Sequence, residues 1–261
     1  MPKSECDLAG LGVLVTRAAH QSAPLCELIR NHGGRPITFP ALEIVSPENP
    51  SAAQSQLAQL DGFDIAVFIS SNAVSHGLAM LEDDAALTRL KIAAVGRSTA
   101  QALEQAGLTV DITPADKFDS EALLETPELH RVKDLRIIIF RGNGGRPLLG
   151  DTLQQRGAEV TYVEVYQRAC PTADPIRLLA VWPASVQIVT ATSIDILNNL
   201  TALLGAEGMQ KLRTTPLLVV SERMRQKAIE LGCQSIILAQ RADDQSLLEA
   251  LCSWAETKKS Q

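Results

Sequence analysis

The sequence predicts an α/β protein with two doubly wound parallel-sheet lobes that arose from an internal duplication. Three observations support this fold class. The segment Gly12–Ile44 is echoed by Arg136–Arg168, and the elements after each segment recur in the same order. Short strands that are apolar on both faces alternate with amphipathic helices, which is typical of buried parallel strands. At 261 residues the chain is long enough for two moderate domains.

Each half of the repeat begins with a strand that runs into an arginine, GVLVTR in the first half and RIIIFRGNGG in the second. A helix ending at glycine and a second strand follow. The later units correspond at offsets of roughly 122 to 126 residues. These pairs are Ile65–Leu78 with Gln187–Leu200, Ile92–Thr113 with Leu217–Leu238, and Phe118–Leu124 with Asp243–Leu251. Gly107 and Gly232 are predicted to end the helices before the last strands. Each half therefore reads β-α-β-α-β-α-β-α, with right-handed crossovers.

Composition excludes several classes of protein. The formal net charge of −6 argues against a nucleic-acid binder, which usually carries a basic face. No apolar run approaches the roughly 18 residues of a membrane span, and the N-terminus lacks the pattern of a signal peptide, so we expect a cytoplasmic chain. The five cysteines form no CxxC and suit a reduced compartment, most of them as small buried hydrophobes. The four histidines are too scattered for a metal site.

Polar residues gather where the predicted strands lead into helices. In open parallel sheets, ligands bind beyond the carboxyl ends of the strands, where helix N-termini favour anions. The candidate substrate-binding residues at these junctions are Thr16, Arg17, Ser70, Ser71, Asn72, Arg97, Ser98, Arg141, Gly142, Thr192, Ser193, Ser221 and Arg223. At any one junction a plain helix cap is the commoner explanation. The recurrence of this chemistry at almost every junction predicts a polyanionic small-molecule ligand.

Other chemical motifs are weak or absent. The stretch Gly142–Pro147 lacks the spacing and the lysine of a phosphate-binding loop, and no GxGxxG occurs. No histidine occupies a strand end, which disfavours nucleophilic hydrolysis by a Ser–His–Asp or Cys–His arrangement.

Taken in order, several segments resemble the uroporphyrinogen-III synthase family over most of the chain, from about Leu11 to Leu251. They are Thr16-Arg17, ISSNAV (Ile69–Val74), AAVGRSTAQAL (Ala93–Leu103), DSEALL (Asp119–Leu124), FRGNGGR (Phe140–Arg146), VEVYQR (Val163–Arg168) and the SER turn before RQKAIELG. The chain departs from the Thr-rich turn of some members by having Ser221-Glu222-Arg223 there.

The resemblance implies two lobes joined by a two-stranded linker, with the active site in the cleft between the lobes. One lobe would be discontinuous, formed by 1–36 and 172–261, and the other would comprise 42–165. The linker strands would be 37–41 and 166–171. From the repeat alone, two sequential lobes remain an equally valid arrangement.

The resemblance also implies a cofactor-free lyase that cyclises hydroxymethylbilane, a carboxylate-rich linear tetrapyrrole, to uroporphyrinogen III. Water is lost and ring D is inverted. Tyr166 matches a family tyrosine and is the candidate catalytic residue, a phenol able to assist departure of the hydroxyl; the alternative is a tyrosine that packs the hinge. Ser71, Ser193 and Ser221 would bind substrate carboxylates, with nearby arginines as supplementary contacts. We expect a monomer that contacts the upstream pathway enzyme transiently.

Two functions from other classes compete with this one. The chain could be a non-catalytic two-lobe binding protein for a small polyanionic ligand, although the predicted absence of a signal peptide and the presence of Tyr166 weigh against it. A nucleotide-dependent transferase is disfavoured because no convincing phosphate motif occurs.

Overall fold

The computed structural model describes residues 6–83, 85–115 and 119–259. Contacts divide the chain into two units: unit 1 comprises Met1–Glu43 and Ala169–Gln261, and unit 2 comprises Ile44–Arg168. Phe118, the first residue of one predicted repeat segment, lies outside the described residues. So do the first five and last two residues of the predicted discontinuous lobe.

Unit 1 is built on a five-stranded sheet with the order β10-β9-β8-β1-β2, and all of its described pairings are parallel. The strands are β1 (Gly12–Val15), β2 (Arg35–Thr38), β8 (Ile188–Thr190), β9 (Leu217–Val219) and β10 (Ile236–Leu238). The helices are α1 (Ala19–Asn31), α8 (Ile176–Ser185), α9 (Ile194–Thr214), α10 (Glu222–Glu230) and α11 (Asp244–Lys259). Helix α9 is broken at Gly205, whose backbone is not helical.

Unit 2 has a second five-stranded sheet, with the order β3-β7-β6-β4-β5. Its strands are β3 (Glu43–Val45), β4 (Ile65–Phe68), β5 (Lys91–Ala94), β6 (Arg136–Gly142) and β7 (Glu159–Ala169). Its helices are α2 (Pro50–Leu57), α3 (Ser71–Ala79), α4 (Arg97–Gln105), α5 (Ser120–Leu124), α6 (Pro127–His130) and α7 (Leu148–Gln155), with short 3-10 turns at Leu60–Gly62 and Leu87–Arg89.

The two sheets share the order of four strands, β9-β8-β1-β2 in unit 1 and β5-β4-β6-β7 in unit 2, and exchange strands between the halves of the repeat. Unit 1 adds β10 beside β9, where the strand predicted at the equivalent place in unit 2 is an isolated bridge between Ala93 and Ile112, and unit 2 adds β3 beside β7. In unit 1, the first two strands of the first half (β1, β2) pair with the later strands of the second half (β8, β9, β10). In unit 2, the first two strands of the second half (β6, β7) pair with the later strands of the first half (β4, β5). The predicted α/β fold with parallel sheets and a duplicated topology is confirmed.

Backbone pairing continues from each sheet into the segments predicted as linker strands. Of residues 37–41, the first two belong to β2, and the Phe39 N–H still donates to the carbonyl oxygen of Val15 in β1 at 3.0 Å. Of residues 166–171, the first four belong to β7. Because these hydrogen bonds extend each sheet, the contact boundaries fall at Glu43/Ile44 and Arg168/Ala169.

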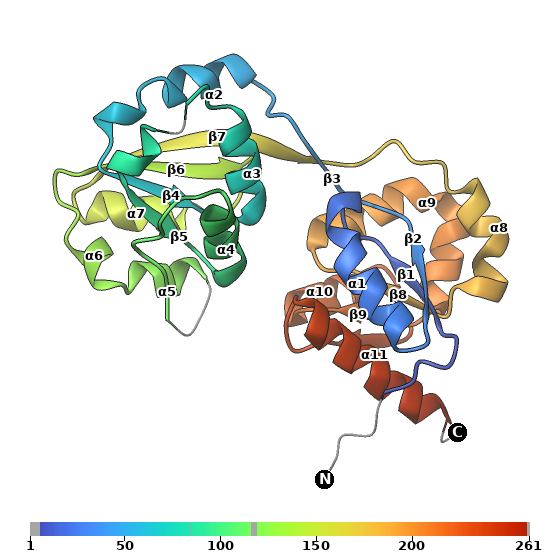
Figure 1. Ribbon diagram of the computed structural model, residues 1–261. Helices are drawn as coiled ribbons and strands as arrows, with labels where there is room; N and C mark the ends of the chain where they lie inside the picture. The colour runs from blue at the N-terminus through green and yellow to red at the C-terminus, as the bar shows by residue number, and fades with distance from the viewer. Residues whose placement is uncertain (1–5, 84, 116–118, 260–261) are drawn as a thin grey trace, which may run out of the picture. The chain divides into compact units, whose positions relative to one another are not determined.

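Helices cover both faces of each sheet, as expected for doubly wound units (Figure 1). In unit 2, Phe68 and Phe140 stack on the face covered by α3 and α4, whereas Val67 and Ile139 face α5, α6 and α7. In unit 1, α1 and α11 pack against Val13 on one face, and α9 and α10, which contact each other, cover the opposite face. The buried strand faces predicted from the sequence therefore form the cores.

The predicted helix ends at Gly107 and Gly232 are also confirmed. Their φ angles are +84° and +85°, a left-handed conformation that glycine adopts without steric cost. Among the described residues, no helix is long and apolar enough to cross a membrane. In the same part of the chain, no cluster of three or more His, Cys, Asp or Glu side chains could hold a metal ion.

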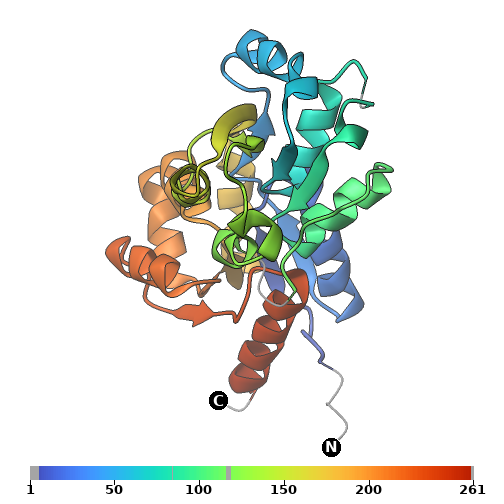
Figure 2. The same cartoon turned by 90° about the vertical axis from the view of Figure 1, so that its left-hand side faces the viewer.

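The cysteines differ in two respects from the prediction of reduced and mostly buried side chains: two of them form a disulfide, and only Cys26 and Cys233 are buried. Cys6 and Cys252 form a disulfide with their Cα atoms 5.6 Å apart, which ties the start of the described chain to α11 in unit 1. The ribbon of this first segment runs beside α11 (Figure 2). The pair was not visible in the sequence because 246 residues separate its members. Cys26 and Cys233 are buried thiols, as expected, and burial raises the pKa of each. Cys170 is exposed.

Reduction of this disulfide is predicted to lower the free energy of unfolding of the protein. Because the cross-link closes nearly the whole chain into one loop, its loss should cost about 2–5 kcal/mol. The measurement is the denaturation midpoint before and after dithiothreitol treatment. Cys252→Ser, which cannot form the disulfide, should lower the midpoint in the same way as reduction. Cys170→Ser is the control and should leave the midpoint unchanged. Alkylation of the unfolded, unreduced protein should label only the three free cysteines. Labelling of all five would contradict the disulfide.

Candidate active site

The strand order of each sheet marks one place as the most favourable for a ligand. In unit 2, β4 and β6 are neighbours, but the chain continues from β4 to β5 on one side and from β6 to β7 on the other. In unit 1, the neighbours β8 and β1 likewise lead to β9 on one side and to β2 on the other. At such a switch point the loops after the two strands diverge, which leaves a crevice beyond the carboxyl ends of the strands. The candidate residues around Ser70, Gly142, Thr16 and Ser193 follow these four strands.

In unit 2 the switch point holds a buried tyrosine. Tyr166 of β7 has 0% of its surface exposed, and its ring lies 5.8 Å from that of His76 on α3. The phenol oxygen is 3.1 Å from Oγ of Ser70, and the Arg168 guanidinium donates to it at 3.5 Å. A phenol buried this deeply needs hydrogen-bond partners, because leaving it without them would cost about 1–3 kcal/mol.

Ser70 forms a second hydrogen bond as the N-cap of α3, where its Oγ accepts from the Ala73 N–H at 3.1 Å. Arg168 can only donate to the phenol oxygen, whereas either hydroxyl of the Ser70–Tyr166 pair can be the donor. In the arrangement where the phenol donates, both acceptor positions of the Ser70 Oγ are used, and Ser70 has its own proton left to donate. Because Ser70 is partly exposed, this arrangement would present a polarised hydroxyl donor at the edge of the sheet.

The remaining candidates on the same face of unit 2 are the starts of two helices. Ser71 and Asn72 are the first residues of α3 and are half-buried. Arg97 and Ser98 begin α4 and are exposed. The N-cap of α4 is Gly96, which has no side chain. The backbone N–H groups in the first turn of α4 therefore receive no side-chain hydrogen bond from the N-cap position.

Arg141 lies away from this group. Its side chain is 9% exposed, its Nε donates to the Gly142 carbonyl at 3.1 Å, and its guanidinium stacks over the Tyr162 ring at 4.7 Å. Tyr162 packs with the core on the face of α5, α6 and α7. Arg141 is therefore engaged on the opposite face of the sheet from Tyr166.

In unit 1 the equivalent switch point is closed by bonds between the strand ends. Thr16 is fully buried, and its hydroxyl donates to the carbonyl of Thr190 at 2.5 Å. The hydroxyl of Thr190 donates in turn to the carbonyl of Leu14 at 3.0 Å. These two threonines join β1 to β8 beyond the regular ladder, which is a structural use of Thr16 in this state of the molecule.

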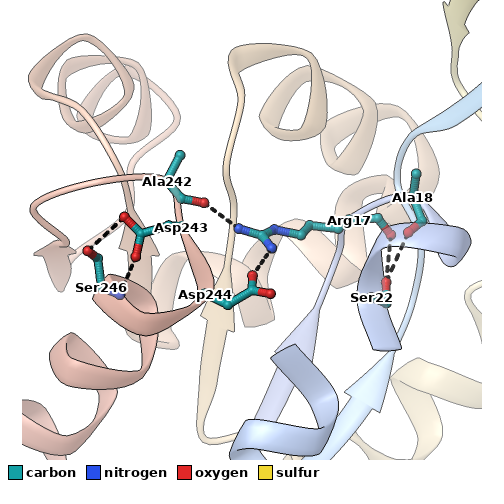
Figure 3. A network of polar contacts seen from close by, with 7 residues as sticks. All are labelled: Arg17, Ala18, Ser22, Ala242, Asp243, Asp244 and Ser246. Carbon is teal, nitrogen blue, oxygen red and sulfur yellow. Dashed lines mark hydrogen bonds and ion pairs between the residues drawn. The ribbon is translucent and has the colours of Figure 1, made fainter. Parts of the chain in front are cut away.

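Arg17 joins the same strand end to the start of α11 (Figure 3). Its guanidinium forms an ion pair with Asp244 and donates to the Ala242 carbonyl at 2.6 Å, and only 12% of its side chain is exposed. Next to it, Asp243 accepts the Ser246 N–H at 2.8 Å as a helix cap. Burial acts to raise the pKa of Asp243, but hydrogen bonds from Ser246 and attraction to Arg241 outweigh it and hold that pKa below its usual value.

Two further serines in unit 1 cap helices in the manner of Ser70. Ser193 accepts from the Ile196 N–H at 3.2 Å at the start of α9, and Ser221 accepts from the Met224 N–H at 3.3 Å at the start of α10. Thr192 precedes the first cap and is half-buried, and Arg223 lies exposed in the first turn of α10. Each serine is thus a helix cap, whose hydroxyl proton remains able to donate.

The structure brings Ser70, Gly142 and Tyr166 together, with Ser71 and Asn72 directly after Ser70 in α3. The remaining candidates lie on the other face of this sheet, at the start of α4, or in unit 1. Sequence reasoning missed Arg168, His76 and Asp244 as members of these networks. Arg168 could have been found, because period-2 alternation places residues two apart on one side of a strand. The partners of Arg17 carried no sequence signal, since 227 residues separate Arg17 from Asp244.

A cavity of about 950 Å³ elsewhere in unit 2 does not suit an anion. It is lined by the carboxylates Asp111, Asp119, Glu121, Glu125 and Glu128. Arg156, at its wall, already donates to the carbonyls of Leu124 and Leu129. Repulsion between these carboxylates and an anionic ligand makes this cavity unsuitable as the site predicted for a polyanion.

Comparison with known proteins gives one consistent result. The model of the family described as "Uroporphyrinogen-III synthase HemD" matches residues 23–249. The uroporphyrinogen-III synthase of Escherichia coli K12 is 38% identical over 92% of this chain and 100% of its own length. That of Salmonella typhimurium LT2 is 36% identical over the same shares.

Solved structures show the same fold. The chain is similar to uroporphyrinogen-III synthetase from Helicobacter pylori 26695, with a TM-score of 0.63 and 14% identity, covering 94% of this chain and 99% of that one. A mutant uroporphyrinogen III synthase from the extremely thermophilic bacterium Thermus thermophilus matches with a TM-score of 0.58 and 18% identity, covering 95% and 99%. With the family model matching most of its length and the bacterial relatives aligned from end to end, this chain belongs to the uroporphyrinogen-III synthase family.

Proposed function

We propose that this chain cyclises hydroxymethylbilane to uroporphyrinogen III, with loss of water and inversion of ring D. The observation that carries the chemistry is the hydrogen-bond chain from Arg168 through Tyr166 to Ser70 at the switch point of unit 2. The reaction loses one water molecule and changes no oxidation state overall, so it needs no redox cofactor.

The chain of donors suits the first chemical step. The terminal hydroxyl of the substrate leaves when its C–O bond breaks, and the departing oxygen takes up a proton and becomes water. Ser70 is partly exposed and is the member of the hydrogen-bond chain that is able to contact that oxygen. The buried phenol of Tyr166 polarises Ser70 by donating a hydrogen bond to its Oγ. The positive charge of Arg168 next to the phenol strengthens both donors. Tyr166 thus acts together with Ser70 rather than alone.

The azafulvene left by this step reacts with the substituted carbon of ring D and passes through a spiro intermediate. Uncatalysed closure gives the non-inverted isomer, so the protein must favour one folded conformation of the substrate, which is catalysis by orientation. We propose that the helix starts near Ser71, Arg97, Ser193 and Ser221 bind substrate carboxylates. Their backbone N–H groups and hydroxyls supply donors, and the positive ends of the helix dipoles favour anions.

The same proposal covers the oligomeric state and location of the chain and the delivery of its substrate. The chain works as a monomer in the cytoplasm and receives hydroxymethylbilane during a transient contact with the enzyme that makes it. The support is chemical: a substrate that closes spontaneously to the wrong isomer is best passed on quickly.

Isomer analysis tests the proposed reaction. The purified chain, added to enzymatically generated hydroxymethylbilane without any cofactor, should yield uroporphyrinogen III as the dominant product after oxidation and chromatography. Heat-inactivated protein is the control and should yield isomer I. If the active protein also yields only isomer I, the synthase assignment fails and the non-catalytic polyanion binder takes its place.

Tyr166→Phe is predicted to lower turnover roughly tenfold to a hundredfold, because general acid assistance contributes at least about that much. The loss of the two hydrogen bonds of the phenol should cost about 1–3 kcal/mol of stability. Ser70→Ala should lower turnover at least as much. Tyr162→Phe is the matched control, since this second tyrosine donates only to the Pro147 carbonyl at 3.3 Å. Full turnover by Tyr166→Phe would refute the role of the phenol.

Two arginines should respond differently to the same substitution. Arg97→Gln is expected to raise KM several-fold and to change the free energy of unfolding by no more than about 1 kcal/mol, since Arg97 is exposed at a helix start and surface ion pairs contribute little. Arg17→Gln should instead lower the free energy of unfolding by about 1.5–3 kcal/mol, because it removes charged hydrogen bonds to Asp244 and Ala242. Steady-state kinetics measure the KM of both variants, and denaturant unfolding measures their free energy of unfolding. A raised KM with unchanged stability for Arg17→Gln would place that arginine on the substrate.

A further inference from the structure

The side chain of Tyr166 does not point where a regular strand would place it. Successive residues of a strand face opposite sides of the sheet. Along β7, Val160 and Tyr162 pack with the core under α5, α6 and α7, whereas Val163 and Val165 pack with the core under α3 and α4. Tyr166 should therefore face the side of Tyr162. It lies instead in the same core as Val165.

An irregularity in the pairing of β6 with β7 explains this reversal. Arg141 pairs with Glu164, but the next residue, Gly142, pairs with Tyr166 and skips Val165. Val165 is thus one extra residue on β7, which is a β-bulge. A bulge shifts the alternation of every later residue on its strand, and here it turns the phenol toward α3 and Ser70.

The turned ring needs space, and Gly142 provides it. A Cβ atom on residue 142 would lie 2.5 Å from Cε2 of Tyr166 and 2.6 Å from its Cζ, closer than real Cβ contacts. Both atoms belong to the rigid ring rather than to a flexible chain end. Any side chain at this position would therefore displace the phenol from the switch point.

Asn143 then holds the part of β7 that follows the bulge through two hydrogen bonds. Its N–H donates to the carbonyl of Tyr166 at 3.1 Å, and its side-chain Oδ1 accepts from the N–H of Arg168 at 2.9 Å. The two bonds hold the backbone at both residues of the donor chain. Asn143 itself is exposed, so its side chain adds little to core packing.

We propose that the Val165 bulge, the missing side chain at Gly142 and the Asn143 hydrogen bonds form a positioning device that holds the Tyr166 phenol against Ser70. These three are positioning residues, which act on the reaction only through Tyr166. The proposal rests on the role proposed above for that tyrosine and extends it by naming what fixes its geometry.

The test uses the fact that the chain has only two tyrosines. Labelling with tyrosine carrying 13C at Cζ gives one NMR resonance for Tyr162 and one for Tyr166, assigned with Tyr162→Phe. Asn143→Ala should shift the Tyr166 resonance and lower kcat about tenfold to a hundredfold, as expected for misplacement of a reacting group by a fraction of an ångström to 1 Å. KM should change by less than about twofold. The fraction of isomer I should rise.

Asn143→Asp is the conservative variant and should restore both the resonance and kcat, because it keeps an oxygen that accepts from Arg168. Gly142→Ala should show the same loss as Asn143→Ala. If Gly142→Ala does not fold, the Asn143 pair decides the question. Gly150→Ala is the matched control: an added Cβ there meets the Tyr162 hydroxyl at 2.0 Å and so crowds the other tyrosine. It should shift only the Tyr162 resonance and leave kcat unchanged.

An unmoved Tyr166 resonance in Asn143→Ala would overturn the positioning proposal, and so would a moved resonance with full turnover. These outcomes are separable from failure of the proposed function, which is decided by Tyr166→Phe. If that variant keeps full turnover while Asn143→Ala loses it, the asparagine acts by a route other than the phenol, and the positioning proposal is wrong.

Discussion

Parallel pairing of β4 with β6 brings together two strand ends that lie far apart in the sequence. Phe68 stands opposite Phe140, and their rings stack with centroids 4.3 Å apart beneath the strand ends. The next residues along the two strands lead to Ser70 and to Gly142. If this register slipped by one residue, every side chain of the strand would change face, so the stacked pair would be lost together with the site. The candidate site therefore depends on the same contacts that hold the core of unit 2.

Burial of Tyr166 imposes the second constraint. A tyrosine with no exposed surface contributes apolar packing to the core, but its hydroxyl must find partners. Ser70 and Arg168 are those partners, and the serine is already fixed by its bond to the Ala73 N–H. The rigid placement of the phenol and the order of the serine cap thus stabilise each other. Such a network needs little reorganisation when charge develops on a nearby oxygen, which is the property that lowers a reaction barrier.

The two units use their switch points differently. In unit 1 the threonines Thr16 and Thr190 close the strand ends on each other, and Arg17 is held by Asp244. In unit 2 the corresponding place holds a glycine, a tyrosine and a serine, and the donor chain ends at a partly exposed hydroxyl. The two switch points differ in the side chains at the strand ends and in the backbone of β7, whose bulge turns Tyr166 toward Ser70.

The sequence by itself determined the elements and the fold class. Apolar runs such as IAVFI, the arginines near the ends of β1 and β6, and the glycines at helix ends are local signals, and local signals specify strands, helices and turns. The serines at 70, 193 and 221 could likewise be predicted at helix starts, since capping is a local interaction. What only the tertiary structure decided are the contacts across long separations: the Cys6–Cys252 disulfide, the Arg17–Asp244 pair, and the turn of Tyr166 toward Ser70. The last depends on a single unpaired residue, Val165, and the position of a bulge is set by pairing with a neighbouring strand, which no pattern within β7 records.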